Sequence, residues 1–511
     1  MLRTARRSVQ ILLLGFFFLL LLLARYPFEN PFPVQFFLTL DPLVVFSACI
    51  AARALIPNAL PALILLVLTA FAGRFFCGWI CPLGTSLDAS DGIMAKASRS
   101  NTPEKTRLRW IKYGIWIAIV SASIFSIQLA GFLDPMSLFT RTAVTVLYPV
   151  FVYFTDGWIG LMFSVGFLED TAFRINQALQ SLVLPVHAVL FRGSIFIAAM
   201  FLIILVLGHY QKRFWCRNLC PLGAMLGLFS LFRLYRRRVD DTCTECGLCH
   251  RSCRMGAIPK DVRKTDHTEC INCMDCQAIC PVHAIHFDLR STPSAAPVDL
   301  SRRRILGAGA SGIAALGLLR VGFRDSVSAG KVVRPPASLE EAGFLDRCVR
   351  CGECIRICST SGAGLHFTAL ESGWEGLGTP QLLTPAGYCE YNCNLCGQVC
   401  PTGAIHPVTV DEKHRIKMGT AHFNKATCIP WYYGENCMVC EEHCPVPEKA
   451  IQFVEKEITT IDGRMASVLL PYVREDRCIG CGICTWCCPL TGDKGITLNH
   501  DGEQRWPVQE G

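Results

Sequence analysis

The stretch Cys270-Ile-Asn-Cys-Met-Asp-Cys-Gln-Ala-Ile-Cys-Pro281 decides the fold, because other informative segments repeat its spacing. The spacing is C-x-x-C-x-x-C-x-x-x-C-P. Three closely spaced thiolates wrap three irons of one cubane cluster, and the fourth, followed by proline, reaches a neighbouring cluster. A zinc or disulfide knot is the alternative, but zinc sites usually pair two C-x-x-C arms across a longer loop. The stretch therefore predicts iron–sulfur ligation.

A second run lies just upstream, at Cys243, Cys246, Cys249 and Cys253. Together the two runs resemble the two-cluster bacterial ferredoxin, although Arg254 replaces the proline that would follow the first run. The resemblance implies an α+β ferredoxin domain over residues 239–290 in which the two runs exchange one ligand. One [4Fe-4S] cluster would then be held by Cys243, Cys246, Cys249 and Cys280. The other would be held by Cys253, Cys270, Cys273 and Cys276.

The composition places part of the chain in a membrane. The 511 residues suffice for about three domains, and 51% of them are hydrophobic, with a mean hydropathy of +0.35. Thirty cysteines do not indicate a disulfide scaffold, because such scaffolds are normally small. The net charge of +8 comes with arginines beside apolar segments. This pattern favours membrane orientation over nucleic-acid binding.

Residues 1–238 predict an α-helical membrane domain with about four transmembrane helices. Arg3, Arg6 and Arg7 precede an uncharged run over 9–24, which is typical of a first transmembrane helix that starts inside. A signal peptide is the alternative, but no small-residue cleavage site precedes Tyr26.

The rest of this domain is an internal repeat of a helix, an L-D-P loop, a helix and C-x-x-x-C-P-L-G. The two copies end at Gly84 and Gly223, and each is followed by basic residues. Spans are expected over 59–76, 113–133 and 194–208. If each repeat is an out-and-back pair, both cysteine motifs face the arginine-rich, cytoplasmic side. We interpret the apolar residues 142–168 as a re-entrant or surface segment, because a further span would place Cys216 outside.

Each repeat supplies two thiols one helical turn apart. We expect Cys77, Cys81, Cys216 and Cys220 to converge at the cytoplasmic face and to form a further iron–sulfur site. Local disulfides, which a reducing cytoplasm disfavours, and packed free thiols are the alternatives.

A linker and a second membrane segment are expected over 291–323. Residues 291–298 are rich in Ser, Pro and Ala, and Ser301-Arg302-Arg303-Arg304 precedes a Gly/Ala/Leu stretch that ends at Leu319. The pattern resembles an internal twin-arginine export signal, and an ordinary stop-transfer helix is the alternative. Either interpretation takes the chain outward, with a weak cleavage signal at 327–329.

Residues 324–511 predict a four-cluster ferredoxin domain. Its four runs are Cys348, Cys351, Cys354, Cys358; Cys389, Cys393, Cys396, Cys400; Cys428, Cys437, Cys440, Cys444; and Cys478, Cys481, Cys484, Cys488. An eight-residue insertion follows Cys428, which makes it the least secure ligand, and Cys487 fails on spacing. Six complete runs in the chain predict six [4Fe-4S] clusters.

The whole order resembles the quinol dehydrogenase module of periplasmic nitrate reductase, with a NapH-type membrane subunit (residues 1–290) fused to a NapG-type ferredoxin (residues 301–511). Methylamine-utilisation ferredoxins are similar. The resemblance implies an inner-membrane protein that oxidises quinol from the quinone pool and relays electrons to a periplasmic redox protein or reductase. An accessory reductase that matures or maintains a partner metalloenzyme is the alternative.

Two aspartates are candidates for quinol deprotonation. Asp41 and Asp134 are ionisable groups near apolar segments, which are often functional. The alternative is that each Asp-Pro pair only turns the chain. Haem is disfavoured because only His187 and His209 lie in or beside apolar segments, and no glycine-rich nucleotide fingerprint indicates NAD or flavin.

Overall fold

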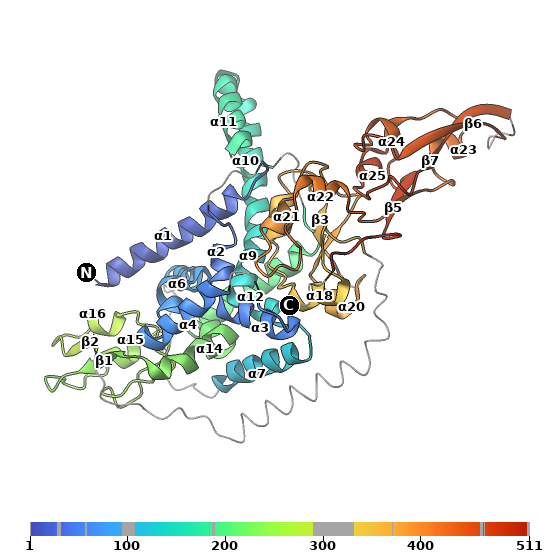
Figure 1. Ribbon diagram of the computed structural model, residues 1–511. Helices are drawn as coiled ribbons and strands as arrows, with labels where there is room; N and C mark the ends of the chain where they lie inside the picture. The colour runs from blue at the N-terminus through green and yellow to red at the C-terminus, as the bar shows by residue number, and fades with distance from the viewer. Residues whose placement is uncertain are drawn as a thin grey trace. The chain divides into compact units, whose positions relative to one another are not determined.

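The computed structural model describes residues 2–27, 32–56, 59–94, 108–182, 184–185, 190–289, 332–369, 371–459, 463 and 465–507. These residues form two compact units (Figure 1). Unit 1 draws on Met1–Leu21, Phe32–Ala143 and Ile195–Gly322, and unit 2 on Leu22–Pro31, Val144–Ser194 and Phe323–Gly511. The predicted linker, the twin-arginine segment, the cleavage signal at 327–329 and His187 lie outside the described residues.

The internal repeat is visible in the local structure of unit 1, where four helices of one copy correspond to four of the other. The first copy contains α3 (Pro42–Ala52), α4 (Leu60–Ala72), α5 (Phe75–Trp79) and α6 (Pro82–Met94). The second contains α9 (Pro135–Thr142), α12 (Ser194–Tyr210), α13 (Phe214–Asn218) and α14 (Pro221–Phe229). Around them lie α1 (Leu2–Leu23), α2 (Phe36–Thr39), α7 (Trp110–Ile124), α8 (Ala130–Leu133) and the short η4 (Ser230–Phe232). The core forms where α14 packs against α3, α4 and α7.

Each Asp-Pro pair starts a helix. Asp41 caps α3 by accepting hydrogen bonds from the backbone N–H groups of Leu43 (2.8 Å) and Val44 (3.3 Å). Asp134 caps α9 in the same way, from Met136 (3.0 Å) and Ser137 (2.8 Å). Aspartate followed by proline is a strong helix start, because the side chain satisfies free N–H groups and proline needs none. Each aspartate therefore determines where its helix begins.

The apolar helices differ in length from those expected. Within the described part of the chain, Arg3–Leu23 and Pro135–Phe163 are long and apolar enough to cross a membrane. The helices α4, α7 and α12 have 13, 15 and 17 residues, below the roughly 20 that a full span needs. The expected count of four transmembrane helices is thus not supported by helix length.

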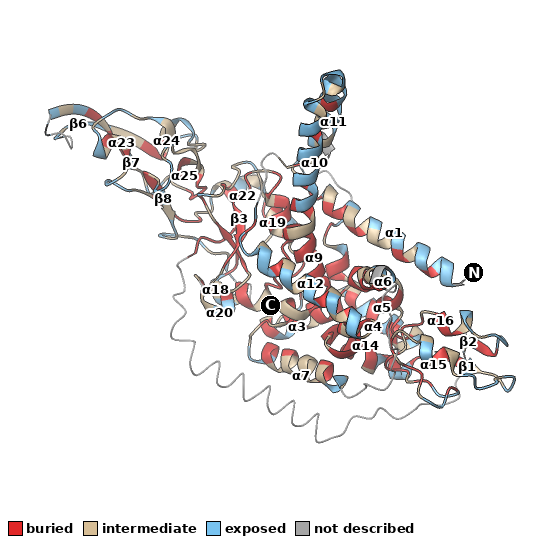
Figure 2. Ribbon diagram, turned by 180° about the vertical axis from the view of Figure 1, so that it is seen from behind, coloured by how far each residue is buried: buried red, intermediate tan, exposed pale blue. Residues whose placement is uncertain are grey.

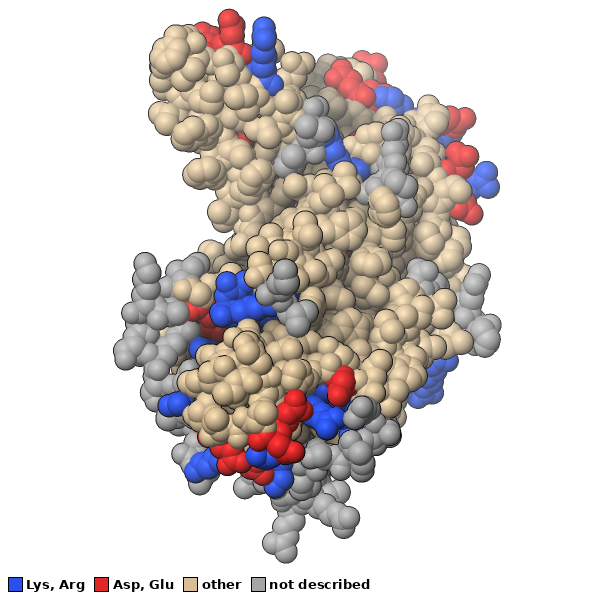
Figure 3. All heavy atoms as spheres, turned by 90° about the vertical axis from the view of Figure 1, so that its left-hand side faces the viewer, with Lys and Arg blue, Asp and Glu red and all other residues tan. Residues whose placement is uncertain are grey.

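The segment interpreted as re-entrant, 142–168, is largely helical. From α9 the chain continues through a π-helical turn, η2 (Ala143–Leu147), into α10 (Tyr148–Phe163). After the short η3 (Gly166–Leu168), α11 (Glu169–Leu182) packs back against α10. Figure 2 shows α10 and α11 largely exposed and α9 largely buried. Wide uncharged areas separate the groups of charged atoms in Figure 3.

Three ferredoxin modules share one plan, an antiparallel strand pair with two short packed helices. The first has β1 (Tyr235–Val239), β2 (Ile285–Leu289), α15 (Leu248–Ser252) and α16 (Asp275–Ala278). The second has β3 (Leu365–Phe367), β4 (Pro380–Leu382), α19 (Glu353–Cys358) and α21 (Leu395–Gln398). The third has β5 (Thr420–Phe423), β8 (Ile496–Asn499), α24 (Val439–Glu442) and α25 (Ile483–Cys487).

The remaining elements of unit 2 surround these modules. They are α18 (Glu341–Arg347), α20 (Gly373–Gly376), α22 (Val410–His414), α23 (Ile429–Tyr432) and the hairpin of β6 (Ile451–Thr459) and β7 (Met465–Val473). The first module belongs to unit 1 together with the repeats, and its first strand begins at Tyr235.

The capping role of Asp134 is testable by two substitutions. Asp134→Ala removes the cap of α9 and should lower the free energy of unfolding by about 1 kcal/mol or more, whereas Asp134→Asn should retain most of it. Thermal unfolding of the detergent-purified chain measures both. Equal losses in the two variants would show that the cap is not what the side chain contributes.

Candidate functional site: groups of four cysteines

The first module brings its eight cysteines together with one ligand exchanged. Burial raises the pKa of the Cys276 thiol to about 12, and nearby Cys270 and Cys253 add to the rise. Cys253 also raises the pKa of Cys273, after burial and Asp275. Cys253 therefore lies with the second run. In the other group, Cys243 and Cys246 adjoin Cys249, and Cys280 packs with Cys243 on the module core.

The same exchange occurs twice in unit 2. The electrostatic contacts of the buried thiols define the groups Cys348, Cys351, Cys354, Cys400; Cys358, Cys389, Cys393, Cys396; Cys428, Cys437, Cys440, Cys488; and Cys444, Cys478, Cys481, Cys484. Each consecutive run thus gives its fourth thiol to its neighbour. Cys428, the least secure ligand in the sequence, lies inside a group, whereas Cys487 lies beside Lys494.

The chemistry of these groups fits iron–sulfur clusters. One small cavity is lined by all four of Cys253, Cys270, Cys273 and Cys276, and another by all four of Cys358, Cys389, Cys393 and Cys396. Among the described residues, no three His, Cys, Asp or Glu side chains are placed to hold a single metal ion. A zinc ion would draw its sulfurs to about 2.3 Å from one point. A cubane spreads them, because each thiolate binds a different iron.

The four cysteines of the repeats form a further group. All are buried free thiols. Burial raises the pKa of Cys81, and Cys77 and Cys216 add to the rise; burial also raises the pKa of Cys220, to which Cys216, Cys77 and Cys81 add. Cys220 caps α14, with its sulfur accepting from the Gly223 N–H at 3.3 Å. The structure thus places two half-sites, one from each repeat, face to face.

Sequence reasoning missed two arginines that stand three residues before the first cysteine of each motif. Arg213 Nη1 donates to the carbonyl of Cys77 at 2.8 Å, and Nη2 donates to that of Gly84 at 3.1 Å. Arg74 of the first copy lies in the same way against Gly223 of the second copy. A Cβ atom added to Gly223 would lie 2.7 Å from Arg74 Nη2. Each arginine therefore lies against the glycine of the other copy. The shared R-F-[FW]-C pattern was the available signal.

Both arginines are fully buried positive charges beside the thiols. Burial alone would lower the pKa of Arg213, but Asp88 and Cys216 outweigh it, so that its pKa is raised. For Arg74, Cys77 and Glu269 outweigh burial in the same way. These cations suit a site whose thiols become thiolates when metal binds.

The helix α5 of the first motif, with Arg74 just before it, packs directly on the residues around Cys270. Trp79 Nε1 donates to the carbonyl of Asn272 at 2.9 Å, and Arg74 Nη1 donates to that of Thr268 at 2.8 Å. A Cβ on Gly78 would overlap the carbonyl oxygen of Ile271. The group of the repeats therefore adjoins that of the first ferredoxin module.

The two candidate aspartates also meet. The side chains of Asp41 and Asp134 are both fully buried, and they lie close enough for each to affect the other electrostatically. Two carboxyl groups in contact share a proton, because double ionisation would place like charges side by side.

Comparisons with known proteins assign the ferredoxin part. The methylamine utilization ferredoxin-type protein MauM of Methylorubrum extorquens is 35% identical over 204 residues, which is 38% of this chain and 88% of the relative. The ferredoxin-type protein NapG of Escherichia coli is 34% identical over 184 residues, 35% of this chain and 77% of the relative. The chain belongs to this family of ferredoxin-type proteins. It is a 4Fe-4S electron-transfer protein.

A family model described as a 4Fe-4S binding domain matches residues 56–100 and 194–239. These segments contain the four cysteines of the repeats. No solved structure matches the chain. The ferredoxin part of the resemblance found in the sequence is confirmed.

Neighbouring cysteines allow a matched test of the exchanged groups. Cys488→Ala removes a ligand next to Cys428, Cys437 and Cys440, and should lower the iron content of the reconstituted chain by about four atoms. Cys487→Ala should leave it unchanged. Iron and sulfide analysis measures both variants, and equal losses would contradict the grouping.

The contact at Gly78 gives a second test. Gly78→Ala forces the Ile271 carbonyl to move, and overpacking of this kind costs roughly 1–3 kcal/mol. We expect a lower unfolding temperature and slower reduction of the first ferredoxin module. Gly15→Ala is the control, since nothing lies within 4 Å of its Cβ position. An unchanged Gly78→Ala protein would show that the two sites are not in contact.

Proposed function

We propose that the chain is a membrane-bound electron-transfer protein that takes electrons from the quinol pool and passes them to a redox protein or reductase on the periplasmic side. The six ferredoxin groups would hold six [4Fe-4S] clusters, and Cys77, Cys81, Cys216 and Cys220 a further iron–sulfur cluster. Such clusters carry single electrons over a wide range of potentials. The observation that best supports the proposal is the close packing of successive groups.

In unit 1 the packing begins at the repeats. Their four-cysteine group adjoins the Cys270 run through Gly78 and Trp79. That run in turn shares its module with Cys243, Cys246 and Cys249 by ligand exchange.

In unit 2 two modules are joined end to end. The Cys389 N–H donates to the carbonyl of Cys481 at 2.9 Å, and the two thiols lie close enough to affect each other electrostatically. Because Cys389 and Cys481 belong to different modules, this contact makes their groups neighbours. Within each module, the exchanged cysteines connect its two groups to each other. The four groups of unit 2 therefore form a continuous series.

The proposed fusion of a NapH-type membrane part with a NapG-type ferredoxin is supported by two findings. NapG aligns with only 35% of the chain, and the 4Fe-4S model matches residues 56–100 and 194–239, in the two repeats. We propose that the repeats are the quinol-oxidising part and that residues 324–511 lie outside the inner membrane.

The positions of the two cysteine motifs in unit 1 support this orientation. Because Cys77 and Cys216 meet, an even number of crossings must separate them, and the return of α11 along α10 agrees with that count.

We further propose that the Asp41–Asp134 pair accepts one of the two protons that quinol loses with its two electrons, and that the other proton leaves to bulk water. A buried pair that shares one proton can take up one more. The backbone hydrogen bonds of the caps hold both carboxyl groups in place for that transfer.

Turnover with a reduced quinol analogue and an artificial acceptor tests the function. The loaded chain, with about 24 iron atoms from six clusters, should oxidise the analogue catalytically. Asp41→Asn and Asp134→Asn keep the caps but cannot take a proton, so we expect rates at least tenfold lower with unchanged iron content. Asp241→Asn, on a fully exposed residue, is the control. A fully loaded chain without turnover would favour the accessory-reductase alternative.

A further inference from the structure

A cavity of about 600 Å³ in unit 1 lies beside the four-cysteine group of the repeats and has no part in the function proposed above. It lies between the start of α1, the helix α6 and the first ferredoxin module. Its cationic lining consists of Arg3, Arg6, Arg7, Lys212 and Arg254, against the carboxyl groups of Asp88, Asp91 and Asp275. The lining thus has more cations than anions.

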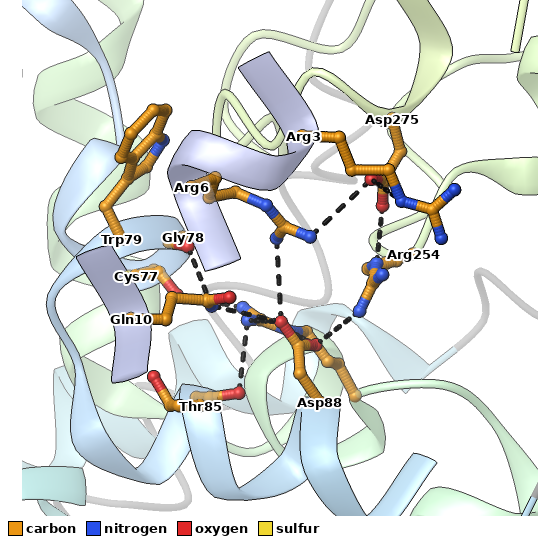
Figure 4. A network of polar contacts seen from close by, with 12 residues as sticks. Arg3, Arg6, Gln10, Cys77, Gly78, Trp79, Thr85, Asp88, Arg254 and Asp275 are labelled. Carbon is orange, nitrogen blue, oxygen red and sulfur yellow. Dashed lines mark hydrogen bonds and ion pairs between the residues drawn. The ribbon is translucent and has the colours of Figure 1, made fainter. Parts of the chain in front are cut away.

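Two of the carboxylates are already engaged by cations (Figure 4). Asp88 accepts from Arg213 Nε and Nη2, both at 2.7 Å, and pairs with Arg254 at 2.9 Å. Asp275 accepts from Arg254 Nε at 2.5 Å. These contacts leave the cations at the mouth, Arg3 and Arg7, largely exposed.

Arg6 is the residue that points to a ligand. Its side chain is buried, yet its nearest carboxylate oxygens, on Asp88 and Asp275, are both 3.5 Å away. That is longer than a charged hydrogen bond, which spans about 2.7–2.9 Å. Its Nε and Nη1 groups have no hydrogen-bond partner. A buried guanidinium with unused donors beside a cavity is matched by an anion with several acceptor oxygens.

The position of the cavity identifies the source of the anion. Arg3, Arg6 and Arg7 begin a helix that is long and apolar enough to span a membrane. One turn further along, Ile11 and Leu12 are 68% and 70% exposed. Basic residues at the end of an apolar helix lie at the level of the lipid headgroups. A soluble anion would not need this apolar surface next to it.

We propose that this cavity binds the phosphate headgroup of an anionic membrane phospholipid, whose acyl chains lie along the exposed apolar side of α1. The proposal rests on the membrane location proposed above. Arg6 donates to the phosphate from inside, and Arg3, Arg7 and Lys212 supply positive charge at the mouth. Because Asp88 also holds Arg213, which donates to the Cys77 carbonyl, a bound lipid would stabilise the four-cysteine group.

The test uses the full chain purified in a neutral detergent. Phosphatidylglycerol should raise its unfolding temperature by several degrees, whereas phosphatidylcholine of the same chain length and glycerol phosphate should not. In Arg7→Gln/Lys212→Gln we expect the apparent affinity for phosphatidylglycerol to fall by roughly tenfold to thirtyfold, since each basic residue contributes to headgroup binding. Lys264→Gln/Lys456→Gln, on exposed residues away from the cavity, is the charge-matched control and should bind like wild type.

Native mass spectrometry on the same samples counts bound lipid and keeps the proposal testable if Arg6→Gln fails to fold. Equal shifts with both lipids, an equal shift with glycerol phosphate, competition by a quinol analogue, or equal losses in both double variants would each overturn it. Quinol turnover by the same preparations is a separate readout. Turnover without lipid selectivity refutes only this inference, and selectivity without turnover refutes only the proposed function.

Discussion

The structure depends on one constraint, the exchange of the fourth thiol between consecutive cysteine runs. Cys253 belongs with the run that starts at Cys270, and Cys358 and Cys400 trade places in the same way. A single run therefore cannot complete a site. The two short helices of each module have to pack together, and the strand pair closes around them, because only then do the exchanged thiols reach their partners.

The two repeats of unit 1 meet the same constraint by symmetry. Each copy gives two thiols and one arginine, and each arginine lies against the glycine of the other copy. Arg213 also donates to the backbone carbonyl of Cys77. At Gly223 of the second copy, a side chain would displace the guanidinium group of Arg74. A four-cysteine site and its compensating charges are thus assembled from two half-sites that are each incomplete.

Cysteine spacing was sufficient to predict the runs and the α+β ferredoxin modules, because cluster ligation restricts spacing more tightly than helix propensity restricts length. Helix lengths were not predictable, since some of the apolar residues beyond α4 and α7 belong to the separate short helices α5 and α8. Arg233 and Arg237 are two of the basic residues that follow the second repeat. Both are buried, where Arg233 contacts Asn272 and His267 and Arg237 donates to the backbone carbonyl of Val262. The number of charged residues in a segment of sequence does not reveal such tertiary contacts.

The exchanged thiols also decide where a gene for this chain could be split. A break between α22 and β5 would leave every module whole, and the hydrogen bond from the Cys389 N–H to the Cys481 carbonyl would then join two separate fragments. A break between Cys358 and Cys389 would leave two fragments, neither able to complete its site. Ancestral fusion or fission of such genes would be confined to the intervals between modules, so that modules are inherited in pairs of clusters.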